Sequence, residues 1–86
     1  MPEVSRFFGI IIAMYYNDHA PPHFHAKYGA HRAKIAITSG AILDGSFPRR
    51  ALALVEEWRR VHEVELSAVW RQIMDRKPHD KIEPLE

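Results

Sequence analysis

Three of the six histidines in this chain lie within residues 17–25, on either side of a pair of prolines. The ionisable side chains of this segment are Asp18, His19, His23 and His25. Imidazole can act as a base, as a metal ligand or as a group whose charge changes near neutral pH. We therefore expect the functional site at this segment, and three hypotheses for its chemistry stay open.

The first hypothesis is a metal site. On a strand, His23 and His25 would point to the same face, with Cα atoms roughly 6.5–7 Å apart. Both imidazoles could bind one ion from that spacing, and His19 or Asp18 would supply a third ligand. Because the chain has no cysteine, the ligands would be nitrogen and oxygen atoms, which suit Zn²⁺ or Ni²⁺. The other two hypotheses require no cofactor.

The second hypothesis is that the same face binds or cuts RNA. His23 and His25 would serve as general base and general acid at a ribose 2′-hydroxyl, a ribonuclease reaction that needs no metal. Residues 1–50 hold six basic and three acidic side chains, so this half of the chain would meet a polyanion. The side chains expected to contact the nucleic acid are Lys27, Arg32, Lys34 and, by stacking on a base, Tyr16.

The third hypothesis is a protein-interaction domain without chemistry. Asp18 would then hold a turn through a bond from its side chain to the backbone, and the histidines would be polar surface residues. Exposed sheet edges bind other strands readily, so the partner would be a small cognate protein or a second copy of the chain.

The first half of the chain predicts an antiparallel sheet. Residues 7–16 are apolar and rich in isoleucine and aromatic residues, and residues 23–28 and 31–37 alternate between apolar and polar side chains. A two-residue turn at Gly29 and Ala30 would set Tyr28 opposite His31 and Phe24 opposite Ile35. One face would then be polar, with His23, His25, Lys27, Arg32 and Lys34.

The hairpin between residues 7–16 and 23–28 has a longer loop. Pairing Tyr16 with His23 would set Met14 opposite His25 and Ile12 opposite Lys27. The side chains directed into the core would be Ile11, Ala13 and Tyr15. On the face that the helices leave open, a partly apolar patch beside a basic rim would consist of Ile12, Met14, Tyr16 and Leu43, and such a patch resembles an interface.

Residues 48–76 predict two helices, because apolar side chains recur there at helical spacing and Pro48 suits a first turn. We therefore expect an α+β fold in the order ββββαα. It would have a three- to four-stranded antiparallel sheet in residues 1–45, two helices in residues 48–76 on one face, and a tail in residues 77–86. Residues 1–86 would form a single domain.

Nearly the whole chain resembles the bacterial family catalogued as domain of unknown function 4160. The matching segments are residues 2–10, 17–25, 48–52, 57–58 and 81–85. The resemblance implies no settled activity. Members resemble one half of two-gene cassettes, which implies a toxin–antitoxin-like role on RNA or on a cognate protein partner.

The sequence also predicts a cytoplasmic protein without a membrane partner. The apolar run at residues 7–16 is shorter than the roughly 20 residues that a membrane span requires. No cleavage site of small residues follows it, so it does not resemble a secretion signal.

Overall fold

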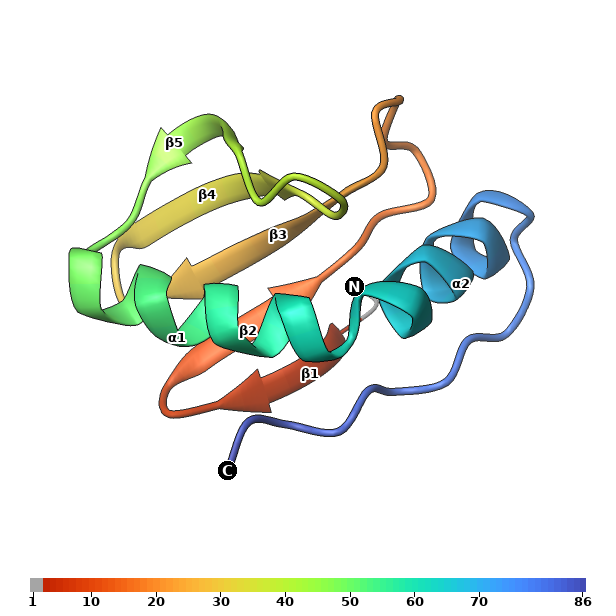
Figure 1. Cartoon of the computed structure of the whole chain (residues 1–86). Coiled ribbons are helices and arrows are strands. Elements are labelled where there is room, and N and C mark those ends of the chain that lie inside the picture. The colour runs from red at the N-terminus through yellow and green to blue at the C-terminus, as the bar shows by residue number, and fades with distance from the viewer. Residues whose placement is uncertain (1–2) are drawn as a thin grey trace.

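A computed structural model describes residues 3–86, which form a five-stranded antiparallel sheet followed by two helices (Figure 1). The strands are β1 (Glu3–Phe7), β2 (Ile10–Ala13), β3 (His23–Tyr28), β4 (His31–Ala36) and β5 (Ile42–Ser46). The helices are α1 (Arg49–Val61) and α2 (Glu63–Met74). The strands lie in chain order across the sheet, and each pairs antiparallel with the next. The α+β prediction is confirmed, with five strands in place of three to four.

Residues 7–16, expected to form one strand, contain a turn instead. Phe8 and Gly9 both have a positive φ, 49° and 79°, which matches a two-residue hairpin turn of type I′. β1 and β2 pair on either side of this turn, with Phe7 opposite Ile10. Gly9 suits the second position of such a turn, but a positive φ is uncommon for an aromatic residue, so Phe8 argued against a turn here.

The hairpin of β3 and β4 has the predicted register, from Tyr28 opposite His31 to Phe24 opposite Ile35. Its alternating pattern assigned the two faces correctly. Phe24 and Ile35 are fully buried, while Lys27 and Arg32 are exposed.

The predicted register between β2 and β3 was wrong by one residue. Ala13, and not Met14, lies opposite His25, and Ile11 lies opposite Lys27. Since side chains alternate along a strand, this shift exchanges the two faces of β2. Ile12 and Met14 are consequently fully buried in the core, and the expected apolar patch that included them does not form.

The shift follows from the loop between β2 and β3, which is longer than expected. β2 ends at Ala13. A turn follows within the loop at residues 15–18, where the backbone N–H of Asp18 donates to the carbonyl oxygen of Tyr15. Uniformly apolar residues before the loop could not reveal which of them faces the core.

Both helices pack on one face of the sheet, and no helix within residues 3–86 covers the other face (Figure 1). Trp58 of α1 is fully buried, and its ring lies 5.3 Å from that of Phe7 and 5.9 Å from that of Phe24, centroid to centroid. α2 contributes Leu66, Val69 and Ile73 to the same core. The apolar stripes predicted for residues 48–76 are therefore the faces that hold the helices to the sheet, except at Val61, which was expected on the first stripe and is 69% exposed.

The tail lies alongside β1 (Figure 1). The backbone N–H of Ile82 donates to the carbonyl oxygen of Val4 at 2.9 Å, and the indole N–H of Trp58 donates to that of Glu83 at 2.8 Å. The Ile82 side chain is only 4% exposed. The tail thus covers the outer edge of β1, whereas β5, at the opposite edge, is exposed along its whole length.

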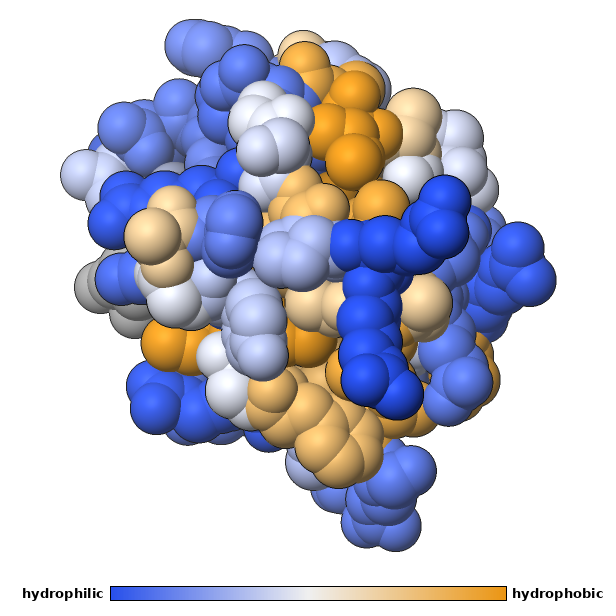
Figure 2. Space-filling view, turned by 90° about the vertical axis from the view of Figure 1, so that its left-hand side faces the viewer, coloured by the Kyte–Doolittle hydropathy of each residue, from blue (hydrophilic) through white to orange (hydrophobic). Residues whose placement is uncertain are grey.

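Figure 2 shows the end of the molecule at which α1 begins. Apolar side chains there are interspersed with hydrophilic ones. Phe8 and Tyr28 are among the exposed large apolar residues of the chain. Neither helix in residues 3–86 is long and apolar enough to span a bilayer.

Candidate metal centre

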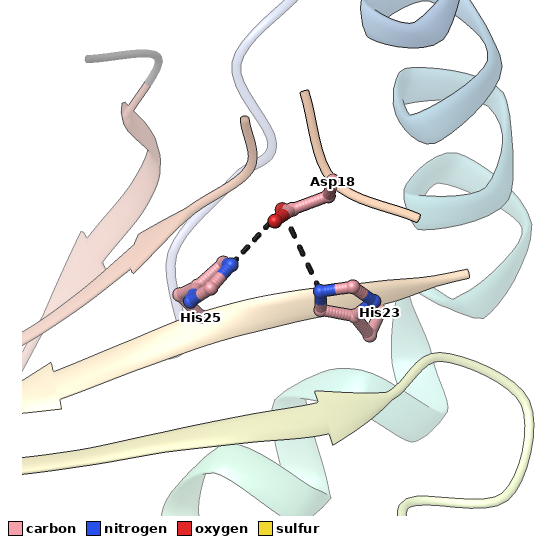
Figure 3. Close-up of side chains that lie close together, drawn as sticks. All are labelled: Asp18, His23 and His25. Atoms are coloured by element: carbon pink, nitrogen blue, oxygen red, sulfur yellow. Dashed lines mark hydrogen bonds and ion pairs between the residues drawn. The ribbon is translucent and has the colours of Figure 1, made fainter. Parts of the chain in front are cut away.

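Asp18, His23 and His25 meet at one end of β3 (Figure 3). The two histidines are two residues apart on β3, and Asp18 comes from the loop between β2 and β3. Both imidazoles point toward the Asp18 carboxylate. Its Oδ2 atom lies 2.9 Å from His25 Nε2 and 3.5 Å from His23 Nε2. One potential ligand atom from each residue lies within 4.8 Å of the other two.

The ring of His23 is held in one orientation. Its Nδ1 atom lies 2.8 Å from the carbonyl oxygen of Pro21, and because a carbonyl oxygen can only accept, Nδ1 carries the hydrogen. In the neutral ring, Nε2 then holds a free electron pair. This atom is buried, has no hydrogen-bond partner among residues 3–86, and points toward Asp18.

Trp70 of α2 covers the other side of His23, with ring centroids 5.3 Å apart. His23 is only 4% exposed. Burial of an imidazole nitrogen without a partner costs free energy, so the position favours a ligand that uses the electron pair.

His25 occupies the more open side of the site. Its side chain is 26% exposed, against 15% for that of Asp18. The ring of Tyr15 meets the His25 ring edge-on, at 4.7 Å between centroids. Tyr15 and Asp18 therefore hold His25 from two sides while leaving part of the ring in contact with solvent.

The spacing of the Asp18 carboxylate from the two imidazoles is compatible with a small cation. A tetrahedral ion with ligand bonds of about 2.0–2.1 Å holds its ligand atoms about 3.3 Å apart. The two nitrogen-to-oxygen distances, 2.9 and 3.5 Å, lie on either side of that value. Across the shorter one His25 Nε2 donates a hydrogen bond to Asp18, so a cation bound there would take the place of that hydrogen. Two imidazoles and one carboxylate are also a common zinc ligand set, in which the fourth position binds water or substrate.

The other predicted site residues lie in different places. His19 is exposed and lies outside the group of three. Tyr16 is also exposed, and the guanidinium of Arg76 lies over its ring at 5.0 Å. Lys27, Arg32 and Lys34 come together on the open face of the sheet, as their predicted register requires.

These three cations line a hollow of about 320 Å³ on the open face. Its apolar floor includes Ile11 and Ala13, and its polar lining includes Asp44 of β5. Tyr15 and His25 also line the hollow, so the hollow adjoins the group of Asp18, His23 and His25. The metal candidate and the cationic surface thus share one side chain, His25.

Tyr15, Trp70 and Asp44 were not predicted as site residues. Tyr15 was expected in the core, and the one-residue shift of β2 moved it to the histidine face. Trp70 lies on an apolar helical stripe, and the spacing of such a stripe does not distinguish a core residue from one that lines the site. A correct β2 register would have revealed Tyr15, whereas no local signal points to Trp70.

A comparison with protein families matches the model of the domain of unknown function DUF4160 to residues 9–71. No curated protein and no solved structure matches the chain. The match covers more than half of the chain and includes the loop and strand that carry Asp18, His23 and His25. The chain therefore belongs to the DUF4160 family of unknown function.

Proposed function

We propose that this protein binds one divalent transition-metal ion, Zn²⁺ or Ni²⁺, through Asp18, His23 and His25. The observation that carries the proposal is the orientation of His23, whose Nδ1 donates to Pro21 while its buried Nε2 points toward Asp18 without a hydrogen-bond partner among residues 3–86. Histidine ligands of metals typically donate their second ring N–H to a backbone carbonyl or a carboxylate in this way.

The charge at the site supports the same assignment. The Asp18 side chain is 15% exposed, and in the described part of the chain its ion-pair contacts are the two imidazoles. No lysine or arginine among residues 3–86 neutralises it. A bound cation would supply that charge and would use the free electron pair of His23.

Three protein ligands leave a coordination position on a tetrahedral ion for water or for another ligand. Structural zinc sites usually take four protein ligands, so a three-ligand site indicates a reactive or ligand-binding metal. His25 belongs both to the proposed metal site and to the lining of the hollow on the open face.

Isothermal titration calorimetry of metal-free protein with ZnCl₂ or NiCl₂ tests the proposal. We expect one ion per chain and an affinity that falls more than about 100-fold in Asp18→Asn and in His23→Gln, since even loss of an outer-shell partner costs 10–100-fold. His19→Gln is the matched control, because His19 lies in the same loop but outside the group. Equal loss in the control, or no binding by the wild type, would overturn the proposal.

Thermal unfolding provides a second measurement. A metal that binds only the folded chain stabilises it by about 2.7 kcal/mol at 100 times its Kd. Asp18→Asn changes one partly buried atom and should remain folded, so loss of the metal-dependent shift in this variant would reflect binding and not misfolding.

The toxin–antitoxin-like role, the cognate partner, the metal-independent ribonuclease activity and the cytoplasmic location stay predictions from the sequence. The metal proposal depends on none of them. A homodimer through a sheet edge is likewise a prediction, and β5 is the exposed edge it would use.

A further inference from the structure

Three cations on the open face are arranged as a group without ion-pair partners. Lys27 of β3 lies opposite Arg32 of β4, and Lys34 of β4 lies opposite His25. In the part of the chain that the structure describes, none of the three forms an ion pair. Cations gathered on one surface repel each other, so their grouping favours an anionic ligand.

The hollow between these cations is amphipathic. Ile11 and Ala13 provide an apolar floor, and Tyr15 provides an aromatic ring. Among residues 3–86, Asp44 is the one aspartate or glutamate that lines it, and a carboxylate there can accept hydrogen bonds from hydroxyl or amino groups of a ligand. The volume of about 320 Å³ falls at the small end of the range for small-molecule sites.

We infer that this hollow binds a nucleotide, either free or within single-stranded RNA. Lys27, Arg32 and Lys34 would neutralise its phosphate and, in a single strand, the two phosphates next to it. Tyr15 and the apolar floor would contact its base, and Asp44 would accept a hydrogen bond from its sugar or base. A nucleotide combines these three properties, whereas inorganic phosphate would leave the apolar floor unused. This inference goes beyond the proposed function, because the hollow can bind a phosphate without a metal at Asp18, His23 and His25.

Fluorescence anisotropy with a labelled oligouridylate tests the inference on metal-free protein in the presence of EDTA. Neutralising three phosphates on a single strand predicts a slope of about −2 for log K against log salt. The affinity should therefore fall about 15-fold between about 50 and 200 mM salt. Absence of binding, or a slope near zero, would overturn the inference whatever the metal titration shows.

Two double variants with the same loss of charge separate the hollow from general electrostatic attraction. Lys27→Gln/Arg32→Gln removes two exposed cations of the hollow, and its salt slope should decrease in size to about −0.7. Arg49→Gln/Arg50→Gln removes two exposed cations at the start of α1 that do not line the hollow, and its slope should stay at about −2. Equal effects of the two variants would overturn the inference.

Competition identifies the source of the nucleotide. If uridine monophosphate displaces the oligouridylate, the hollow accepts free nucleotides. If only unlabelled oligouridylate displaces it, the ligand is the single strand. Displacement by inorganic phosphate as effectively as by both of these would contradict a role for the apolar floor and would overturn the nucleotide assignment.

Repeating the titration with Zn²⁺ present measures the relation between the two sites. If the metal position faces the hollow, the affinity for oligouridylate should rise when the metal is bound, and Asp18→Asn should abolish only this increase. Loss of the metal-free affinity in Asp18→Asn would contradict the inference that the hollow binds independently.

Discussion

The Nδ1 atom of His23 lies 2.8 Å from the carbonyl oxygen of Pro21, two residues earlier in the chain. This bond assigns the hydrogen to Nδ1 and directs the other nitrogen of the ring toward Asp18. The rigid double-proline segment is therefore part of the site, because it positions the backbone acceptor that orients the buried histidine. The proposed metal site depends on this orientation.

Trp70 should influence metal affinity although it offers no ligand atom. Its ring packs against His23 and limits access of water to the buried nitrogen. We expect Trp70→Ala to lower the affinity for Zn²⁺ about 10-fold or more without changing the stoichiometry, as changes around metal ligands commonly do. Calorimetric titration measures the effect.

Met74→Ala is the control for Trp70→Ala, since Met74 is also partly buried on α2 and packs against the core. Its affinity for Zn²⁺ should match that of the wild type. An unchanged affinity in Trp70→Ala would show that the indole has no part in positioning His23.

Glu56 and Arg59 should make folding stability depend on pH. The hydrogen bond from Arg59 holds the pKa of the Glu56 carboxyl below its usual value, and Arg59 also donates to the carbonyl oxygen of Ile37 at 2.8 Å. A lowered folded-state pKa means that the folded protein binds fewer protons than the unfolded chain, so stability rises with pH. This contribution is present above pH 4.5 and is lost as the pH falls through the lower folded-state value.

Glu56→Gln should lower the free energy of unfolding by about 1–3 kcal/mol at neutral pH, because the buried Arg59 guanidinium loses the nearer of its two carboxylate partners, Glu56 and Glu63. The difference from the wild type should shrink as the pH falls from 4.5 through the lower folded-state pKa of Glu56, where the folded carboxyl becomes protonated. Urea unfolding at a series of pH values measures it, with the exposed Glu57→Gln as control. A difference that is constant down to about pH 3 would exclude Glu56 as the titrating group.

The tail should contribute to the stability of the whole domain. Ile82 is 4% exposed and belongs to the core, so Ile82→Ala should cost about 2–4 kcal/mol in urea unfolding. Glu83→Ala serves as control, because the Glu83 side chain is exposed and only its backbone oxygen binds Trp58. If Ile82→Ala changed stability by less than about 0.5 kcal/mol, the tail would not be packed as described.

The sequence predicted the fold best where its pattern was strictly periodic. Residues 23–28 and 31–36 alternate, and Gly29 marks their turn, so both register and faces followed. Residues 7–16 have no period because apolar side chains fill both faces of β2, and Gly9 is a weak sign of a turn when an aromatic residue precedes it. The sequence of residues 7–16 therefore revealed neither the division into β1 and β2 nor the register of β2 against β3.

The candidate site was only partly predictable for the same reason. The spacing of His23 and His25 indicates one strand face, but the choice between Asp18 and His19 depends on how the loop folds. Contact of Trp70 with His23 joins residues far apart in the sequence, and no local pattern encodes it. Tyr15 was absent from the predicted site only because the predicted register of β2 was wrong by one residue.

An anomalous difference map from a crystal of the zinc-loaded protein tests the central claim most directly. We predict one strong peak per chain, about 2.0–2.1 Å from Nε2 of His23 and of His25 and about 2.0–2.2 Å from a carboxylate oxygen of Asp18. The His23 Nδ1 bond to Pro21 should persist in that structure. A peak bound instead by His19, His31 or His79, or the absence of any peak at the group, would contradict the claim.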